Sequence, residues 1–308
     1  MTPGAAPGAM GYAGLLFCGA AWGLTTPLIK IATGAGHGAL SIALWQTCLT
    51  VALLGLWLGL RGGIRSLPLD GPALRLYAVF GLMGMALPQW ASFTGTTHLP
   101  AGIMSILLSL VPILALPLAL VLGTERFSAL RLLGVGLGAA AVVILASPGG
   151  ALPEPGLWVW VLVGALAPAL YAIEGAWIAG SRVPAGPLQV LWAGAVVSLI
   201  ALIGLNLGFG GPLLPDALGW PEAAIAVAGL LSLGAFAVYI LLLRRCGAVF
   251  GAQVGYVVTG AGVVFAMTLL GERYPPQVWL ALALLFVGLA LVQPRPGATA
   301  MEGGDVRA

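Results

Sequence analysis

Charged side chains are scarce in this sequence. Only 7% of the 308 residues are Asp, Glu, Lys or Arg, whereas a soluble domain carries roughly 25%. Hydrophobic residues make up 60% of the chain, and the mean hydropathy is +1.09. This composition cannot cover a water-facing surface, so it excludes an ordinary soluble domain and predicts an integral membrane protein.

Cysteine and histidine are also rare. The three cysteines have no paired spacing, which argues against a disulfide framework or a zinc site. No H-E-x-x-H motif, nucleophile elbow or pair of intramembrane acids is present. We therefore expect no metal, no cofactor and no enzymatic activity, although a weak metal site using His37, His98 and nearby acids stays open.

Long apolar runs dominate what is present. A bilayer-crossing helix needs about 20 predominantly apolar residues, and these runs are too continuous for the strands of an outer-membrane barrel. The sequence therefore predicts an all-α fold. The ten predicted spans are 11–31, 38–60, 72–93, 99–122, 128–147, 156–179, 186–208, 221–242, 248–270 and 275–294.

The basic residues sort to one side of these spans. Ten of the twelve fall on the side of the two termini, and only Lys30 and Arg273 fall on the other. Because cytoplasmic loops carry the Lys/Arg excess, we expect both termini in the cytoplasm of a multi-pass cell (inner or plasma) membrane protein. Basic flanks of spans also account for the pI of 9.0, so nucleic acid is not an expected partner.

The chain repeats itself at one offset. GTERFS and GERYPP align Glu125 with Glu272 (272 − 125 = 147), and the same offset aligns Trp45 with Trp192. Two halves of five spans follow, and an odd span count inverts the second half relative to the first. The predicted segments are a tail 1–10, repeat one 11–147, a linker 148–155, repeat two 156–294 and a tail 295–308.

Five plus five spans, Trp22-Gly23 in the first span and the acidic ends of both fourth spans resemble the drug/metabolite transporter superfamily, specifically its EamA-type members. The resemblance covers residues 11–294 and implies a ten-helix bundle that moves small organic solutes, often outward, by alternating access. Many members carry an Arg in span two, where this chain has Trp45-Gln46. A substrate-anion role for that Arg therefore does not carry over.

Two charged residues inside or beside the spans are candidates for coupling or gating. Glu174 lies within a span, where an ionisable group is costly and suggests function. It lies close enough to the predicted cytoplasmic end to pair instead with Arg182, Arg244 or Arg245. Lys30 ends the first span on the other side, as a gate or as an interfacial anchor, so an ion pair with Glu174 is not expected.

Uncharged polar and aromatic side chains supply the candidate substrate site. Their chemistry suits an amphipathic organic solute, although serine and threonine often bond to their own helix and tryptophan often lies at the interface. The candidates are Trp22, Gln46, Gln89, Trp90, Tyr171, Gln253, Tyr256 and Thr259.

The function expected from these features is secondary transport of a small organic metabolite or drug-like solute, most simply export, with proton coupling at Glu174 as one option. A polytopic membrane enzyme and a channel are the alternatives. The expected partners are the solute and the lipid bilayer, with the chain a monomer or homodimer. We expect each repeated Glu-Arg pair to be structural, with the acid capping a helix N-terminus and the arginine at the interface.

Overall fold

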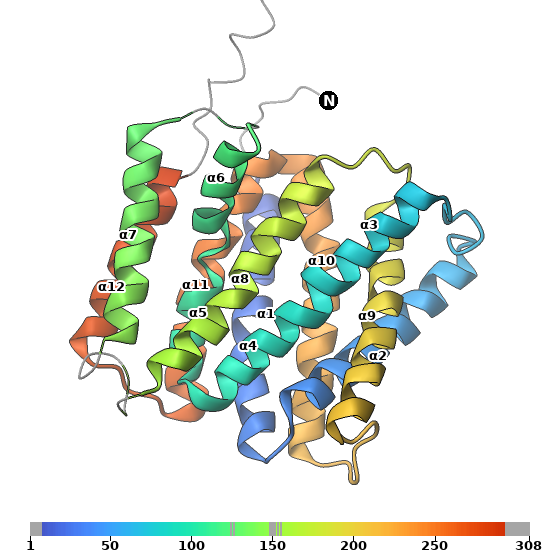
Figure 1. Ribbon diagram of the computed structural model, residues 1–308, viewed down its shortest axis with the longest axis horizontal. Helices are drawn as coiled ribbons and strands as arrows, with labels where there is room; N and C mark the ends of the chain where they lie inside the picture. The colour runs from blue at the N-terminus through green and yellow to red at the C-terminus, as the bar shows by residue number, and fades with distance from the viewer. Residues whose placement is uncertain are drawn as a thin grey trace, which may run out of the picture.

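Apolar helices run between two opposite ends of the molecule in the computed structural model, which describes residues 8–123, 125, 127–147, 152, 154 and 156–292 (Figure 1). These residues contain no β-strand. The predicted linker 148–155, apart from Leu152 and Glu154, and the tail 295–308 lie outside the described part, as do Arg126 and most of the tail 1–10. The all-α membrane class is confirmed.

The first half of the chain holds the following elements: α1 Ala9–Gly34, α2 Ala39–Leu60, α3 Gly71–Gly81, η1 Leu82–Ala86, α4 Leu87–His98, α5 Ala101–Leu108, α6 Val111–Val121 and α7 Ala129–Ala146. The second half holds α8 Trp158–Ala179, α9 Pro187–Phe209, α10 Trp220–Ala252, α11 Val254–Leu270 and α12 Pro276–Val292. Within the described residues, eight of these helical stretches are long and apolar enough to cross a membrane, and α12 is a shorter apolar helix.

Interruptions within the predicted spans have local causes. The predicted span 72–93 is extended to residues 71–98 and contains the π-helical segment η1, which ends two residues before Pro88. A proline lacks the amide proton that an α-helix uses at that position, so the helix changes its hydrogen-bond pattern. In α10, Gly247 has a positive φ of +82°, which glycine adopts without strain because it has no Cβ atom, and the helix axis kinks there.

Helix pairs rather than sequence neighbours build the bundle. The α7 and α12 helices lie side by side at one edge, and α2 packs on α9 at the other (Figure 1). Between them, α1 packs on α10 and α11, while α8 packs on α4, α5 and α6. The largest buried cluster joins α5, α6, α7, α8, α11 and α12 around Leu107, Ile113 and Leu285.

Small residues allow the closest helix approaches. A Cβ atom on Gly134 would lie 2.7 Å from the Gly288 carbonyl oxygen, which explains why α7 and α12 can pack so tightly. Large apolar side chains such as Leu56, Ile200 and Leu207 remain exposed on the helix surfaces. In a chain of this composition those side chains face lipid.

Candidate functional site

A cavity of about 520 Å³ opens where the α1–α2 connection meets α4 and the end of α9. We call it the His37 cavity. Its walls contain Thr33, Gly36, His37, Gly38, Ala39, Leu40, Ser41, Trp90, Thr94, Thr97, Asn206, Phe209, Gly211 and Pro212. The volume lies in the range typical of small-molecule sites, and the lining combines apolar walls with a few polar groups.

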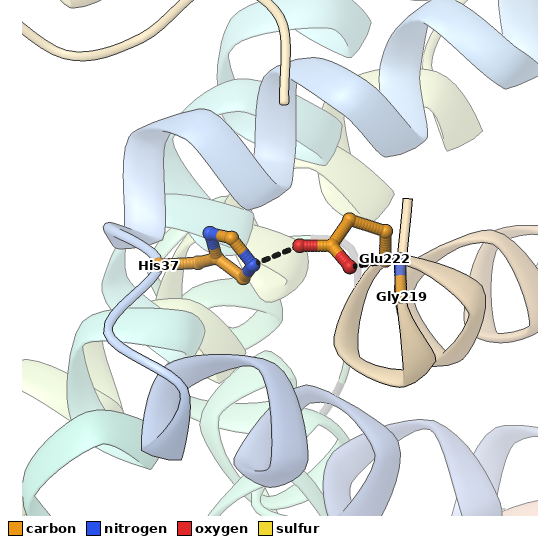
Figure 2. Close-up of polar contacts among 3 residues, drawn as sticks. All are labelled: His37, Gly219 and Glu222. Atoms are coloured by element: carbon orange, nitrogen blue, oxygen red, sulfur yellow. Dashed lines mark hydrogen bonds and ion pairs between the residues drawn. The ribbon is translucent and has the colours of Figure 1, made fainter. Parts of the chain in front are cut away.

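His37 ties the α1–α2 connection to the start of α10. Its Nε2 lies 2.5 Å from Oε1 of Glu222, whose Oε2 accepts a hydrogen bond from the Gly219 amide at 2.7 Å (Figure 2). The His37 ring also meets the edge of Trp45 at 5.1 Å. One carboxylate therefore caps a helix and holds a wall of the His37 cavity at the same time.

The polar side chains of the His37 cavity come from α1, α2, α4, α9 and the α1–α2 connection. Ser41 donates to Oδ1 of the buried Asn206 at 2.9 Å, and Asn206 donates to the Leu202 carbonyl within its own helix at 2.9 Å. Trp90 is 39% exposed, and neither Trp90 nor Thr94 makes a side-chain hydrogen bond to another described residue. The aromatic face of Trp90 and the hydroxyl of Thr94 are thus available to a solute.

Lys30 lines a second pocket of about 260 Å³, which we call the Lys30 pocket. Its ammonium group donates to the carbonyls of Thr96 and Leu99, both at 2.8 Å, and of Thr97 at 3.2 Å. These carbonyls end α4, where the helix dipole favours a cation. Lys30 is therefore engaged in fixing a helix end, a role that its position in the sequence did not reveal.

Glu272 performs the complementary role at the start of α5. Its carboxylate accepts hydrogen bonds from the amides of Ala101 at 2.8 Å and Gly102 at 3.2 Å, and Tyr274 donates to the same carboxylate. Burial, and next the bond to Glu272, raise the pKa of Tyr274. The predicted capping role is confirmed for Glu272, whereas Glu125 pairs with Arg131 at 2.7 Å.

Glu174 lies against the π-helical segment η1. A Cβ atom on Gly84 would lie 3.0 Å from the Cγ and 3.2 Å from the Oε1 of Glu174. No hydrogen bond or ion pair joins Glu174 to any other described residue, so pairing with Arg182, Arg244 or Arg245 does not occur there. The half-buried Tyr171 lies three residues earlier on α8.

Four of the polar and aromatic candidates link helices. Gln46, which is buried in α2, donates to the Ile225 carbonyl of α10 at 3.3 Å, and Gln89 of α4 accepts from Thr47 at 3.3 Å. The ring centroids of Trp22 and Tyr239 lie 5.4 Å apart, and those of Tyr256 and Phe286 lie 5.7 Å apart. Each of these contacts therefore joins two helices of the bundle.

The other candidates are dispersed. Thr259 is fully buried and donates to the Gly255 carbonyl one turn earlier, and Gln253 is exposed at the joint between α10 and α11. Of the ten candidates, Trp90 lines the His37 cavity and Lys30 lines the Lys30 pocket. The predicted residues therefore do not form one common cluster.

The residues predicted from the sequence do not include Ser41, Asn206 or Tyr239. Asn206 is the single asparagine of the chain and lies within an apolar run, a signal that could have drawn attention to it. Ser41 and Tyr239 carry no comparable signal, because serine and tyrosine are ordinary residues of membrane helices. The described residues contain no cluster of three or more His, Cys, Asp or Glu side chains able to hold a metal ion.

Comparisons with known proteins agree with this architecture. Residues 9–147 match the EamA-like transporter family. The probable terminal-alkyne amino-acid exporter of Streptantibioticus cattleyicolor is 26% identical over 291 residues, covering 89% of this chain and 90% of that protein. The uncharacterized inner membrane transporter YedA of Escherichia coli is 26% identical over 277 residues, covering 88% and 86%.

Two further likenesses extend the comparison. The uncharacterized protein PA1977 of Pseudomonas aeruginosa is 32% identical over 207 residues, covering 67% of this chain and 70% of that protein. A crystal structure with 19% identity superposes with a TM-score of 0.60 and covers 92% of this chain and 95% of its own. That structure supports the fold. The chain belongs to the EamA-like transporter family and is a multi-pass membrane transporter of small solutes.

Proposed function

We propose that this transporter exports a small organic solute by alternating access and that proton exchange at Glu174 drives it. The observation that carries the coupling role is the setting of Glu174 against η1 with no cationic partner among the described residues. An ionisable group in a span is costly, and one that has no partner there is expected to serve a function. A carboxyl group that gains and loses a proton during the cycle accounts for its presence there.

Alternating access in this proposal uses ten spans in two inverted repeats, 11–147 and 156–294. Its support is a repeated backbone contact: Glu125 donates its amide proton to the Ala119 carbonyl, and Glu272 does so to the Ala266 carbonyl, both at 3.3 Å. Glu272 lies 147 residues after Glu125, and Ala266 lies 147 residues after Ala119. The pairing of α1 with α10 and α11 likewise matches that of α8 with α4, α5 and α6.

The termini are cytoplasmic in this proposal. In Figure 1 the α2–α3 and α8–α9 connections lie at the end of the bundle where α1 begins, as do the end of α6 and the start of α7. The sequence between these helices carries basic residues. The His37 cavity lies at the opposite end, beside the α1–α2 connection. It is then the extracytoplasmic vestibule through which an exported solute leaves.

Amino acids are the first solutes to test, because a relative is named as an amino-acid exporter. Purified protein in detergent is screened with individual L-amino acids by thermal shift, and the hits are tested for flux in proteoliposomes. A pH gradient should drive flux in the wild type. Glu174→Gln should abolish that gradient-driven flux and leave solute exchange without a gradient intact. Gradient-driven flux of wild-type size in Glu174→Gln would reject the coupling role.

Topology is tested separately. Single cysteines beside Arg126 and beside Arg273, in a variant lacking Cys18, Cys48 and Cys246, are treated with a membrane-impermeant thiol reagent on intact cells. The inverted arrangement requires labelling beside Arg273 and protection beside Arg126. Equal labelling of both positions is incompatible with inverted repeats.

A further inference from the structure

The contact between Glu174 and Gly84 places the carboxyl group deep in the bundle. Gly84 is thirteen residues after Gly71 (84 − 71 = 13) and fourteen before His98 (98 − 84 = 14), so it lies at the middle of the continuous α3–η1–α4 stretch. At 1.5 Å per residue, each end of that stretch is about 20 Å away. Glu174 is only five residues from the end of α8, but its side chain meets the neighbouring helix at mid-length.

One hydrogen-bond donor is missing from the main chain opposite Glu174. In η1 the Leu87 amide donates to the Leu82 carbonyl, five residues back. Pro88 follows and has no amide proton, so it cannot donate to the carbonyl of Gly84, four residues back, or of Met83, five residues back. Pro88 therefore removes one amide donor from the main chain at the level where the carboxyl group lies.

No cation competes for this position among the described residues. The helices packed on α8 and η1 are α3, α4, α5, α6, α7 and α9. Their titratable side chains other than Glu174 and Tyr171 are the exposed Arg75, Tyr77 donating to Pro68, His98 stacked on Trp160, and Arg131 paired with Glu125. The surroundings of Glu174 thus offer hydrogen-bond acceptors and no positive partner.

We propose that η1 is the receptor of protonated Glu174. The protonated carboxyl group donates a hydrogen bond to a main-chain carbonyl that Pro88 leaves without a donor, and Gly84 makes the space for it. The ligand of this site is a proton. The inference rests on the proposed coupling role of Glu174 and assigns Gly84 and Pro88 as positioning residues. When the carboxyl group loses its proton, the same carbonyls repel the carboxylate, so the two protonation states favour different α8–η1 contacts.

Substitution of Gly84 tests the inference, because a Cβ atom at this position would lie close to the Glu174 side chain without overlapping it severely. A methyl group there meets the Cγ, Cδ and Oε1 of Glu174 at 3.0–3.2 Å and must displace the side chain. Gly84→Ala is therefore the variant, and Gly204→Ala is the matched control, since a Cβ atom on the helical Gly204 meets nothing within 4 Å. Alanine at position 174 lacks the Cγ, Cδ and Oε1 atoms that the new methyl group meets, so Glu174→Ala should relieve the clash in the double variant.

The measurement is infrared spectroscopy of the full-length protein in lipid, titrated from about pH 4 to pH 9. The carboxyl C=O band that disappears in Glu174→Gln belongs to Glu174, and its frequency reports whether the protonated group donates a hydrogen bond. We expect Gly84→Ala and Pro88→Ala to shift that band toward the frequency of a free carboxyl group. Gly204→Ala should leave it unchanged, and thermal unfolding establishes that each variant is folded.

The double variant completes the test. Gly84→Ala should lower the unfolding temperature less in the Glu174→Ala background than in the wild type, because the residues are in contact. An unchanged band in both Gly84→Ala and Pro88→Ala overturns the inference even if Glu174→Gln abolishes coupling. An altered band with normal gradient-driven flux in Glu174→Gln instead preserves the receptor and rejects the proposed coupling.

Discussion

The carboxylate of Glu272 accepts a hydrogen bond from the backbone amide of Ala101 at 2.8 Å. The two residues belong to opposite halves of the chain, so a loop of the second half caps a helix of the first. Lys30, from a third helix, fixes the other side of the same corner by binding the last carbonyls of α4. The Leu99-Pro100 corner is thus held by one anion and one cation, each at the helix end that its charge favours.

Loss of the Glu272 cap should destabilise the protein. Glu272→Ala leaves the amides of Ala101 and Gly102 without their acceptor, and the loss of such a cap typically costs about 1 kcal/mol. We expect a fall of a few degrees in the unfolding temperature in detergent. Arg273→Ala is the control, because that side chain is exposed and forms no hydrogen bond with a described residue. Equal effects of the two variants would contradict the capping role.

Tyr274 should make stability sensitive to alkaline pH. Its folded-state pKa is raised above the ordinary value of about 10, so the folded protein keeps the phenolic proton where the unfolded chain has lost it. The stabilisation is complete below about pH 10 and declines as pH rises further. The unfolding temperature of the wild type should therefore fall more between pH 9 and about pH 11 than that of Tyr274→Phe.

Tyr12 provides the control for this titration. It is exposed, with its ring against Phe250. Tyr12→Phe should keep the wild-type alkaline decline. If Tyr274→Phe declines as steeply as the wild type, the hydroxyl does not contribute as inferred.

Lys30 should contribute more to the free energy of unfolding than a surface lysine does. Lys30→Met keeps the apolar stem but leaves three carbonyls at the end of α4 without their donor. Hydrogen bonds to charged groups contribute about 1.5–3 kcal/mol each at most, so we expect a loss of about 2 kcal/mol. Thermal unfolding measures it, with Arg65→Met as the exposed control. A pure gating role for Lys30 predicts altered flux with unchanged stability.

A methyl group added at Gly134 of α7 should disturb the packing of α7 on α12, whereas a methyl group added two residues later, at Gly136, should not. Gly134→Ala places a Cβ atom 2.7 Å from the Gly288 carbonyl oxygen, whereas Gly136 has open space around it. Gly136→Ala should be neutral or stabilising by up to about 1 kcal/mol, because alanine favours the helix. Gly134→Ala should lower the unfolding temperature. The reverse order would show that α7 does not pack on α12 through Gly134.

The helical class and most helix positions could be predicted because they follow from local hydropathy. Apolar runs of about 20 residues have one stable conformation in a bilayer, since every backbone group must be satisfied within the segment. Helix ends were less predictable: α1 continues to Gly34, and the predicted span 72–93 is extended and contains a π-helical segment. Pro88 marked that region, but the register of a π-helix depends on what packs against it.

The candidate site shows the limit of local information more clearly. The importance of Glu174 follows from its charge, but its depth does not, because depth depends on the neighbour that it meets. Counting along α8 puts Glu174 near a helix end, whereas its contact with Gly84 puts it at the middle of another helix. Lys30 and Glu272 show the same limit, since the helix ends that they bind lie about 70 and 170 residues away in sequence.

The sequence by itself determined that this protein is helical and lies in a membrane, because composition and hydropathy act residue by residue. The resemblance of its span pattern to a known family implied small-solute transport. Only the tertiary structure decided which polar groups meet. The contacts of His37 with Glu222, Ser41 with Asn206 and Glu174 with Gly84 join segments that are distant in the chain. In a chain so poor in charge, the few polar groups are placed by helix packing, and that placement defines the site.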